Sequence, residues 1–158
     1  MKVFKFGGAS VKDAEGVKNV ATIINRFPGE QLVIVVSAMG KSTNALEVIV
    51  QNAFEGKTYQ EELNQLYDYH NKIVKELNIH VELNYFIDLI IQQLEANRKM
   101  AFPKYHDQVV SIGELISSSI LSAYLNSVNI INEWTDAREL ILTDDTWRAG
   151  FVEIGRAS

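Results

Sequence analysis

Five consecutive apolar residues, Leu32–Val36, place the strongest constraint on the fold of this chain. A strand with one wet face alternates apolar and polar residues, whereas a strand that is apolar on both faces belongs in the middle of a parallel sheet covered by helices. The neighbouring segments fit that layering. Apolar residues recur at helical spacing over 14–27 until Pro28-Gly29, and a polar loop after the strand leads to a second helix from Asn44.

The first residues of the chain make another strand, turn and helix, and here the turn has the features of an anion site. Val3–Phe6 is a short apolar strand interrupted by Lys5, and Gly7 and Gly8 follow it. Glycines allow backbone conformations closed to other residues and let a phosphate approach the main chain, while a helix N-terminus and a lysine attract negative charge. An ordinary tight turn with Lys5 facing solvent fits these residues equally well.

Composition narrows the class of protein. The chain has 158 residues, of which 47% are hydrophobic, so one domain with a sizeable core is expected. A net charge of −5 without a basic cluster disfavours a nucleic-acid partner. Cysteine is absent and His70, His80 and His106 lack the spacing of a zinc site, so we assign no metal ligands. We find no membrane-spanning run and no room for a signal peptide, and expect a cytoplasmic protein.

Residues 58 to 98 interrupt the alternation of strands and helices. Two successive stripes of apolar residues at 3.6-residue spacing predict a helical hairpin inserted between two α/β units. His70 lies on the first stripe, where a packed histidine is favoured over a metal ligand. Sequence spacing also predicts two capping boxes, Ser10 with Asp13 and Thr58 with Glu61.

The α/β pattern is expected to resume after Pro103. Val109–Ile112 is interpreted as a strand leading into a helix that runs to about Asn126, followed by strands at Val128–Trp134 and Phe151–Ile154. The sequence therefore predicts one α/β unit that carries a helical insert.

Two common phosphate-binding motifs are excluded. Gly40-Lys41-Ser42 follows a strand, as in a P-loop, but Val35 stands where the P-loop needs its first glycine. The dinucleotide-binding fingerprint fails at Ala9 and Lys12, where it requires glycines.

Three separated segments together resemble the aspartate kinase family. They are Lys5-Phe6-Gly7-Gly8-Ala9-Ser10, then Val35-Val36-Ser37-Ala38-Met39-Gly40 with Thr43-Asn44, and finally Gly113-Glu114 with Thr135-Asp136-Ala137-Arg138 and Thr143-Asp144-Asp145. The resemblance implies an α/β, three-layer, largely parallel sheet between helices, the amino acid kinase fold, here incomplete. It also implies phosphoryl transfer from ATP, with Mg²⁺ bound to the nucleotide, to the side-chain carboxylate of L-aspartate, at the start of lysine, threonine and methionine biosynthesis.

The resemblance also implies roles for individual residues. Lys5 corresponds to the family's catalytic lysine on the transferring phosphate, and Gly7, Gly8 and Ser10 to its phosphate-binding turn. For the substrate side, Ser37 and Thr43 match the loop that holds aspartate, and Glu114 matches a glutamate that binds the α-amino group.

Alternatives remain for some of these polar residues. Ser111 and Glu114 have capping-box spacing, so this glutamate has a purely local alternative. Asp136 and Arg138 are expected to pair with each other rather than to bind substrate.

Residues 1–158 are expected to be the N-terminal portion of an amino acid kinase domain. The resemblance implies that an adenine-binding lobe and regulatory domains lie beyond Ser158, since Gly155-Arg156-Ala157-Ser158 only partly matches the family's later Gly-Arg-Gly-Gly-Ser-Asp segment. We therefore expect the chain alone to be inactive and the full-length enzyme to be a homo-oligomer. The alternatives are a short non-catalytic module that binds phosphate or an amino acid, and another member of the kinase superfamily.

Overall fold

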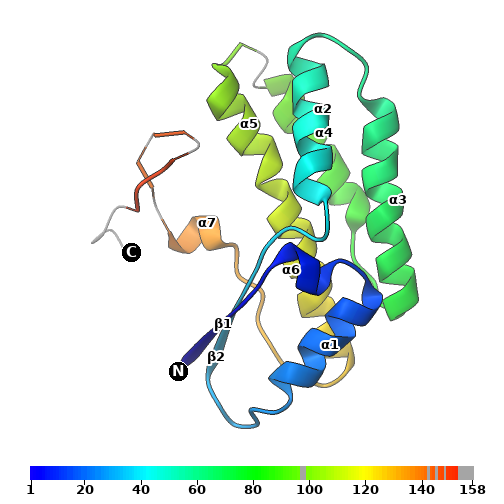
Figure 1. Ribbon diagram of the computed structural model, residues 1–158, viewed down its shortest axis with the longest axis vertical. Helices are drawn as coiled ribbons and strands as arrows, with labels where there is room; N and C mark the ends of the chain where they lie inside the picture. The colour runs from blue at the N-terminus through cyan, green and yellow to red at the C-terminus, as the bar shows by residue number, and fades with distance from the viewer. Residues whose placement is uncertain (97–98, 142, 145, 148, 153–158) are drawn as a thin grey trace.

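The computed structural model describes residues 1–158 except 97–98, 142, 145, 148 and 153–158. A small sheet lies beside a larger bundle of helices (Figure 1). In chain order the elements are β1 (Lys2–Phe6), the 3₁₀ helix η1 (Gly8–Val11), α1 (Ala14–Ile24), β2 (Leu32–Val36), α2 (Ser42–Phe54), α3 (Gln60–Leu77), α4 (Leu83–Ala96), α5 (Phe102–Val110), α6 (Ile112–Ser127) and α7 (Ala137–Leu140).

Strands β1 and β2 pair in parallel, in a register that sets Lys2 against Leu32 and Phe6 against Val36. Their crossover contains α1, as a parallel pair requires. Side chains alternate between a covered face and an open face, and on the open face Val33 and Val35 are 43% and 46% exposed. The prediction that β2 is buried on both faces is therefore wrong for this chain, because the described helices cover only one of them.

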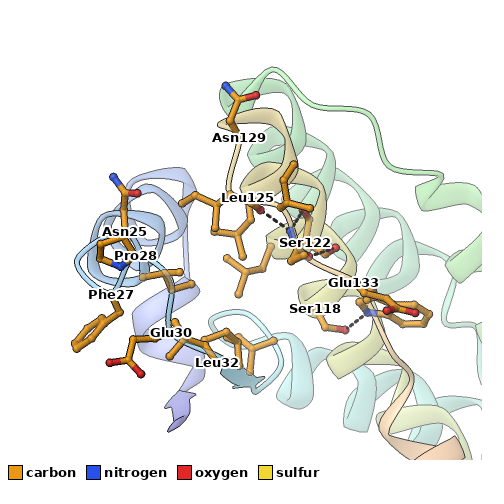
Figure 2. A pocket seen from close by; sticks show the side chains of 18 of the residues that line it. Asn25, Phe27, Pro28, Glu30, Leu32, Ser118, Ser122, Leu125, Asn129 and Glu133 are labelled. Carbon is orange, nitrogen blue, oxygen red and sulfur yellow. Dashed lines mark hydrogen bonds between the residues drawn. The ribbon is translucent and has the colours of Figure 1, made fainter. Parts of the chain in front are cut away.

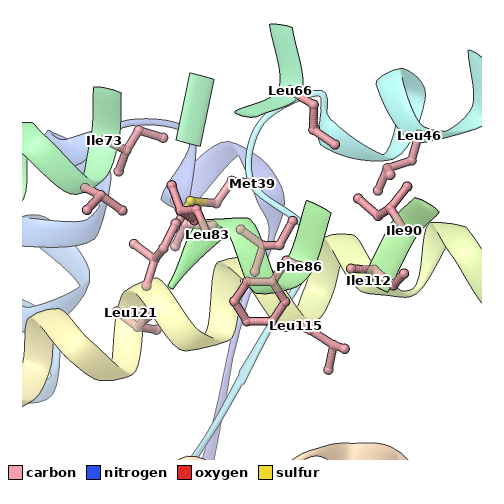
Figure 3. Packing of buried hydrophobic residues seen from close by; sticks show 14 of the residues in the cluster. Met39, Leu46, Leu66, Ile73, Leu83, Phe86, Ile90, Ile112, Leu115 and Leu121 are labelled. Carbon is pink, nitrogen blue, oxygen red and sulfur yellow. The ribbon is translucent and has the colours of Figure 1, made fainter. Parts of the chain in front are cut away.

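The hydrophobic core lies among the helices. Figure 3 shows Met39, which lies in the loop after β2 and is fully buried, among side chains of α2, α3, α4 and α6. Helix α6 contacts β2 as well as α1, α2 and α4, so it joins the sheet to the bundle. The largest fully buried side chains are Tyr105, Met39, Leu46, Ile49, Leu63, Ile90, Leu94, Ile112, Ile116, Ile120, His70 and Val11.

The predicted helical hairpin is confirmed as α3 and α4, and His70 is buried at 2% exposure. The predicted capping boxes are wrong. Asp13 is itself the N-cap of α1, where its Oδ1 accepts a hydrogen bond of 2.8 Å from the N–H of Gly16. Helix α3 begins after Tyr59, and its start has no side-chain cap within the described part of the chain.

The strand predicted at Val109–Ile112 is helical. Ser111 has helical dihedrals (φ −61°, ψ −18°), so α5 and α6 are nearly continuous across it. Three apolar residues and Ser111 make too short a run to separate a strand from a buried helix. The sequence analysis expected no membrane-spanning run, but Phe102–Ser127 is long and apolar enough to cross a membrane by length and composition alone. Half of its apolar 18-residue window is buried inside the protein.

The strand predicted at Val128–Trp134 does not form, because side chains fix this segment to α6 instead. The Asn132 amide bonds Ser122, and Trp134 Nε1 donates to Ser118 Oγ at 2.9 Å. A cleft of about 560 Å³ separates the segment from β2 (Figure 2). Of the strand predicted at Phe151–Ile154, Val152 forms an antiparallel bridge with Thr143, and the rest beyond it lies outside the described residues, as does Gly155–Ser158.

The buried histidine makes stability depend on pH. Burial lowers the pKa of His70 from 6.5 to about 4. Between these values the unfolded chain binds more protons than the folded one, so we expect the free energy of unfolding to fall by about 3 kcal/mol as pH drops through this window. Urea unfolding across this pH range measures the change, and H70Q removes this contribution. An equal pH slope in H70Q contradicts the assignment.

Candidate functional site

Two loops meet at the carboxyl ends of the paired strands. The first runs from Gly7 through η1 and is called the anion loop, and the second, from Ser37 to Lys41, is called the acceptor loop. Parallel strands end at the same edge of a sheet, so pairing alone brings the loops together. One backbone hydrogen bond joins them directly, from the N–H of Gly40 to the carbonyl of Gly8 at 3.0 Å.

Close approach of the two loops explains one glycine of the pair. A Cβ on Gly8 would overlap the carbonyl oxygen of Ala38 and lie 3.3 Å from that of Gly40. Gly7 has an ordinary φ of −75°, and a Cβ there would meet only the tip of Lys5. Neither Gly7 nor Gly8 uses the left-handed backbone conformation that glycine permits. Such a conformation occurs instead at Gly40, with φ +54°.

Lys5 projects from the open face of the sheet at the start of the anion loop. Its side chain is exposed, and Nζ lies 3.8 Å from the position of a Cβ on Gly7, so the ammonium group sits beside the turn. Ser10 is exposed as well, and its N–H donates to the carbonyl of Gly7 at 2.8 Å, closing the turn. The anion loop therefore has an ammonium group beside its first residue, Gly7, and the exposed hydroxyl of Ser10 further along the turn.

The acceptor loop leads into helix α2. Ser37 is half-buried, and its carbonyl accepts a hydrogen bond of 2.9 Å from Ser117 Oγ on α6. Thr43 is half-buried in the first turn of α2, where no described acidic residue or side-chain cap neutralises the helix N-terminus. This end of a 13-residue helix therefore favours a negatively charged group.

Glu114 comes to the acceptor loop from the first turn of α6. The helix packs so closely that a Cβ on Gly113 would lie 3.1 Å from Cβ of Ala38. Partial burial raises the pKa of the Glu114 carboxyl above its ordinary value, and hydrogen bonding from its own backbone N–H and that of Ala38 offsets part of this. Ser111 forms no side-chain cap in the described structure, so the reciprocal capping box is not formed, although the Glu114 carboxyl does accept from its own backbone N–H in the first turn of α6.

The structure thus brings Gly8 against the acceptor loop and Glu114 onto it, although Glu114 follows the loop by more than seventy residues.

Asp136 and Arg138 pair locally, as predicted, through bonds of 2.6 to 3.0 Å, and Asp136 caps α7. Within the described ranges no three His, Cys, Asp or Glu residues gather as a metal site. The sequence analysis did not identify Ser117, which bonds the Ser37 carbonyl, or Tyr69, which bonds the Lys12 carbonyl. Their positions close to Glu114 and His70 in the sequence are the one signal that could have pointed to them.

Comparison with known proteins gives consistent matches. The sequence pattern of the amino acid kinase family matches residues 1–154. Aspartokinase 1 of the chloroplast from Arabidopsis thaliana is 38% identical over 161 residues, covering 96% of this chain and 28% of that protein. The chain therefore spans less than a third of this relative.

Two solved structures have the same fold. Aspartokinase III from Escherichia coli, in complex with aspartate and ADP, superimposes with a TM-score of 0.83 at 24% identity, over 97% of this chain and 35% of that one. Aspartate kinase from Clostridium acetobutylicum has a TM-score of 0.74 at 28% identity, over 89% and 32% of the two chains. These matches confirm the predicted fold class, of which this chain contains a small parallel sheet and its helices.

The contact between the loops gives a test of the two glycines. We expect G8A to lower the free energy of unfolding by about 2 kcal/mol, because the backbone must shift to accommodate the methyl group. G7A is the matched control and changes it by less than about 1 kcal/mol, since its φ suits alanine. Urea titration measures both. Equal effects of the two substitutions contradict the close contact at Gly8.

Proposed function

Because this chain belongs to the amino acid kinase family, we propose that it forms the acceptor side of an active site that transfers the γ-phosphoryl group of ATP to the side-chain carboxylate of L-aspartate. The product is 4-phospho-L-aspartate. The observation that carries this proposal is the contact of the anion loop with the acceptor loop, through Gly8 and Gly40, at the end of a parallel strand pair. Similarity to aspartokinases supports the choice of substrate.

The reaction joins two anions, so neutralising charge is the main task of the site. Attack of a carboxylate on a polyphosphate needs positive groups and fixed donors around the transferring oxygens. In this proposal Lys5 contacts the phosphoryl group, while Gly7, Gly8 and Ser10 hold the phosphate chain. Mg²⁺ arrives with ATP as part of the substrate and is held through the phosphates.

Recognition of aspartate is assigned to the acceptor loop. Glu114 would bind the α-ammonium group by a charge-assisted hydrogen bond, and its partial burial strengthens that bond. Ser37 and Thr43 would hold the remaining polar atoms without crowding the reacting carboxylate. The N-terminus of α2 favours the negative charge of the substrate.

Several features of the whole enzyme go beyond this chain. We propose that residues binding adenine, and those aligning the far side of aspartate, belong to a further part of the kinase, so this chain alone does not turn over substrate. Assembly as a homo-oligomer, a cytoplasmic location and a role in lysine, threonine and methionine biosynthesis are proposed on the family resemblance. Among the relatives, those from plants are described as chloroplastic.

Pyrophosphate tests the anion loop on the chain itself. We expect K5M to weaken pyrophosphate binding by about tenfold or more, because one charge-assisted contact is lost. The control is K2M, on the same strand, where the ammonium group already pairs with Glu30 at 2.8 Å. Isothermal titration calorimetry gives the two affinities. Equal weakening by K2M, or no binding by the wild-type chain, contradicts the assignment.

Succinate separates recognition of the ammonium group from recognition of the carboxylates, because it is aspartate without the amino group. We expect the wild-type chain to prefer L-aspartate over succinate and E114Q to lose about tenfold of that preference. E76Q, an exposed glutamate on α3, is the control. Chemical-shift titration measures these affinities. An unchanged preference in E114Q removes Glu114 from the proposed substrate site.

A further inference from the structure

Two adjacent side chains of helix α3, Tyr69 and His70, lie against the two loops of the proposed site or the residues that directly follow them. The hydroxyl of Tyr69 donates a hydrogen bond to the backbone carbonyl of Lys12, which directly follows η1. The same hydroxyl borders the acceptor loop, since a Cβ on Gly40 would lie 2.5 Å from it. Tyr69 therefore touches the segment after the anion loop and the tip of the acceptor loop with one group.

His70 reaches the end of the acceptor loop through Ser42. Both side chains are 2% exposed. His70 Nδ1 lies 2.8 Å from the carbonyl oxygen of Leu66, and Nε2 lies 3.2 Å from Ser42 Oγ. Ser42 Oγ in turn donates to the carbonyl of Met39 at 2.6 Å. A continuous polar chain thus runs from the backbone of α3 to the backbone of the acceptor loop.

Counting protons fixes the state of this polar chain. The carbonyl of Leu66 only accepts, so Nδ1 of His70 carries the proton. Burial lowers the pKa of His70 to about 4, so the ring is neutral near pH 7 and Nε2 accepts. Ser42 then has one hydroxyl proton and two acceptors, Nε2 and the Met39 carbonyl. The hydroxyl shares this one proton between them, with the shorter contact to the Met39 carbonyl, and so links the His70 ring to the backbone of the acceptor loop.

Side-chain support matters here because the two loops meet through their backbones. Gly8 and Gly40 have no side chains to set the distance between the loops, and a single hydrogen bond of 3.0 Å joins them. The ends of β1 and β2 fix where each loop starts, but not where its tip lies. A misplacement of about 1 Å between reacting groups costs about a hundredfold in rate.

We propose that Tyr69 and His70 are positioning residues that hold the anion loop and the acceptor loop at a fixed separation. The α3–α4 hairpin then helps to position the two loops, in addition to contributing to the hydrophobic core. What the loops bind rests on the proposed function, whereas the positioning itself is a property of this chain. The two side chains act through the backbone of Lys12 and through Ser42, and touch no substrate.

Amide hydrogen exchange on the 158-residue chain, without ligand, tests the proposal. We expect Y69F and H70L each to speed exchange about tenfold over residues 8–12 and 37–43, with exchange in α4 unchanged. H70Q restores slow exchange, because its amide oxygen can accept from Ser42. The controls are Y67F, a half-buried tyrosine of the same helix, and H106Q, a buried histidine on α5.

Nitrogen chemical shifts of the His70 ring give a signature that packing alone does not produce. We expect a neutral ring protonated at Nδ1 at pH 7, and S42A should move the Nε2 resonance towards that of an unbonded nitrogen. A proton on Nε2, or an Nε2 shift unaffected by S42A, overturns the role of His70. Loop exchange that is unchanged in both Y69F and H70L, or equally fast across the whole chain, overturns the proposal as well.

Ligand binding separates this proposal from the proposed function. If the wild-type chain binds pyrophosphate and L-aspartate, H70L and Y69F should weaken L-aspartate binding by about tenfold while H106Q leaves it unchanged. If the wild-type chain binds neither, the proposed function fails, and the exchange and nitrogen-shift data still decide whether the two loops are positioned by α3.

Discussion

The rest of the structure depends on the parallel pairing of β1 with β2. Five residues of each strand align from Lys2 with Leu32 to Phe6 with Val36, so both strands end at the same level. The anion loop and the acceptor loop start from that level, and the N–H of Gly40 then meets the carbonyl of Gly8. A shift of register by one residue would turn Lys5 to the covered face and separate the loops.

Among the described residues, helices support this arrangement from one side of the sheet. Helix α6 packs against Ala38 through Gly113, bonds the Ser37 carbonyl through Ser117 and carries Glu114 onto the acceptor loop. Tyr69 and His70 of α3 contact Lys12 and Ser42, the residues that directly follow the two loops. On the opposite face of the sheet Lys5 lies beside Val35 of the neighbouring strand, and both side chains are exposed.

Local sequence patterns predicted most of the helices and strands around the two loops. Apolar periodicity located β1, β2, α1, α2 and the α3–α4 hairpin, because each pattern is long or sharply bounded by glycine and proline. It failed at Val109–Ile112, where a short, mostly apolar run is helical, and at Val128–Trp134, where side-chain bonds from Asn132 and Trp134 to α6 replace strand pairing. Tyr69 was invisible because its partner Lys12 is 57 residues away. Such contacts exist only once the chain has folded.

We propose that the two loops form adjoining sites for a phosphate chain and for an amino acid. Backbone amide chemical shifts of the 158-residue chain, titrated first with pyrophosphate and then with L-aspartate, test this proposal most directly. We expect pyrophosphate to shift residues 7–10, L-aspartate to shift residues 37–43 and Glu114, and both ligands to shift Gly8 and Gly40. Shifts confined to the cleft of about 560 Å³ between β2 and residues 129–135 would contradict the proposal.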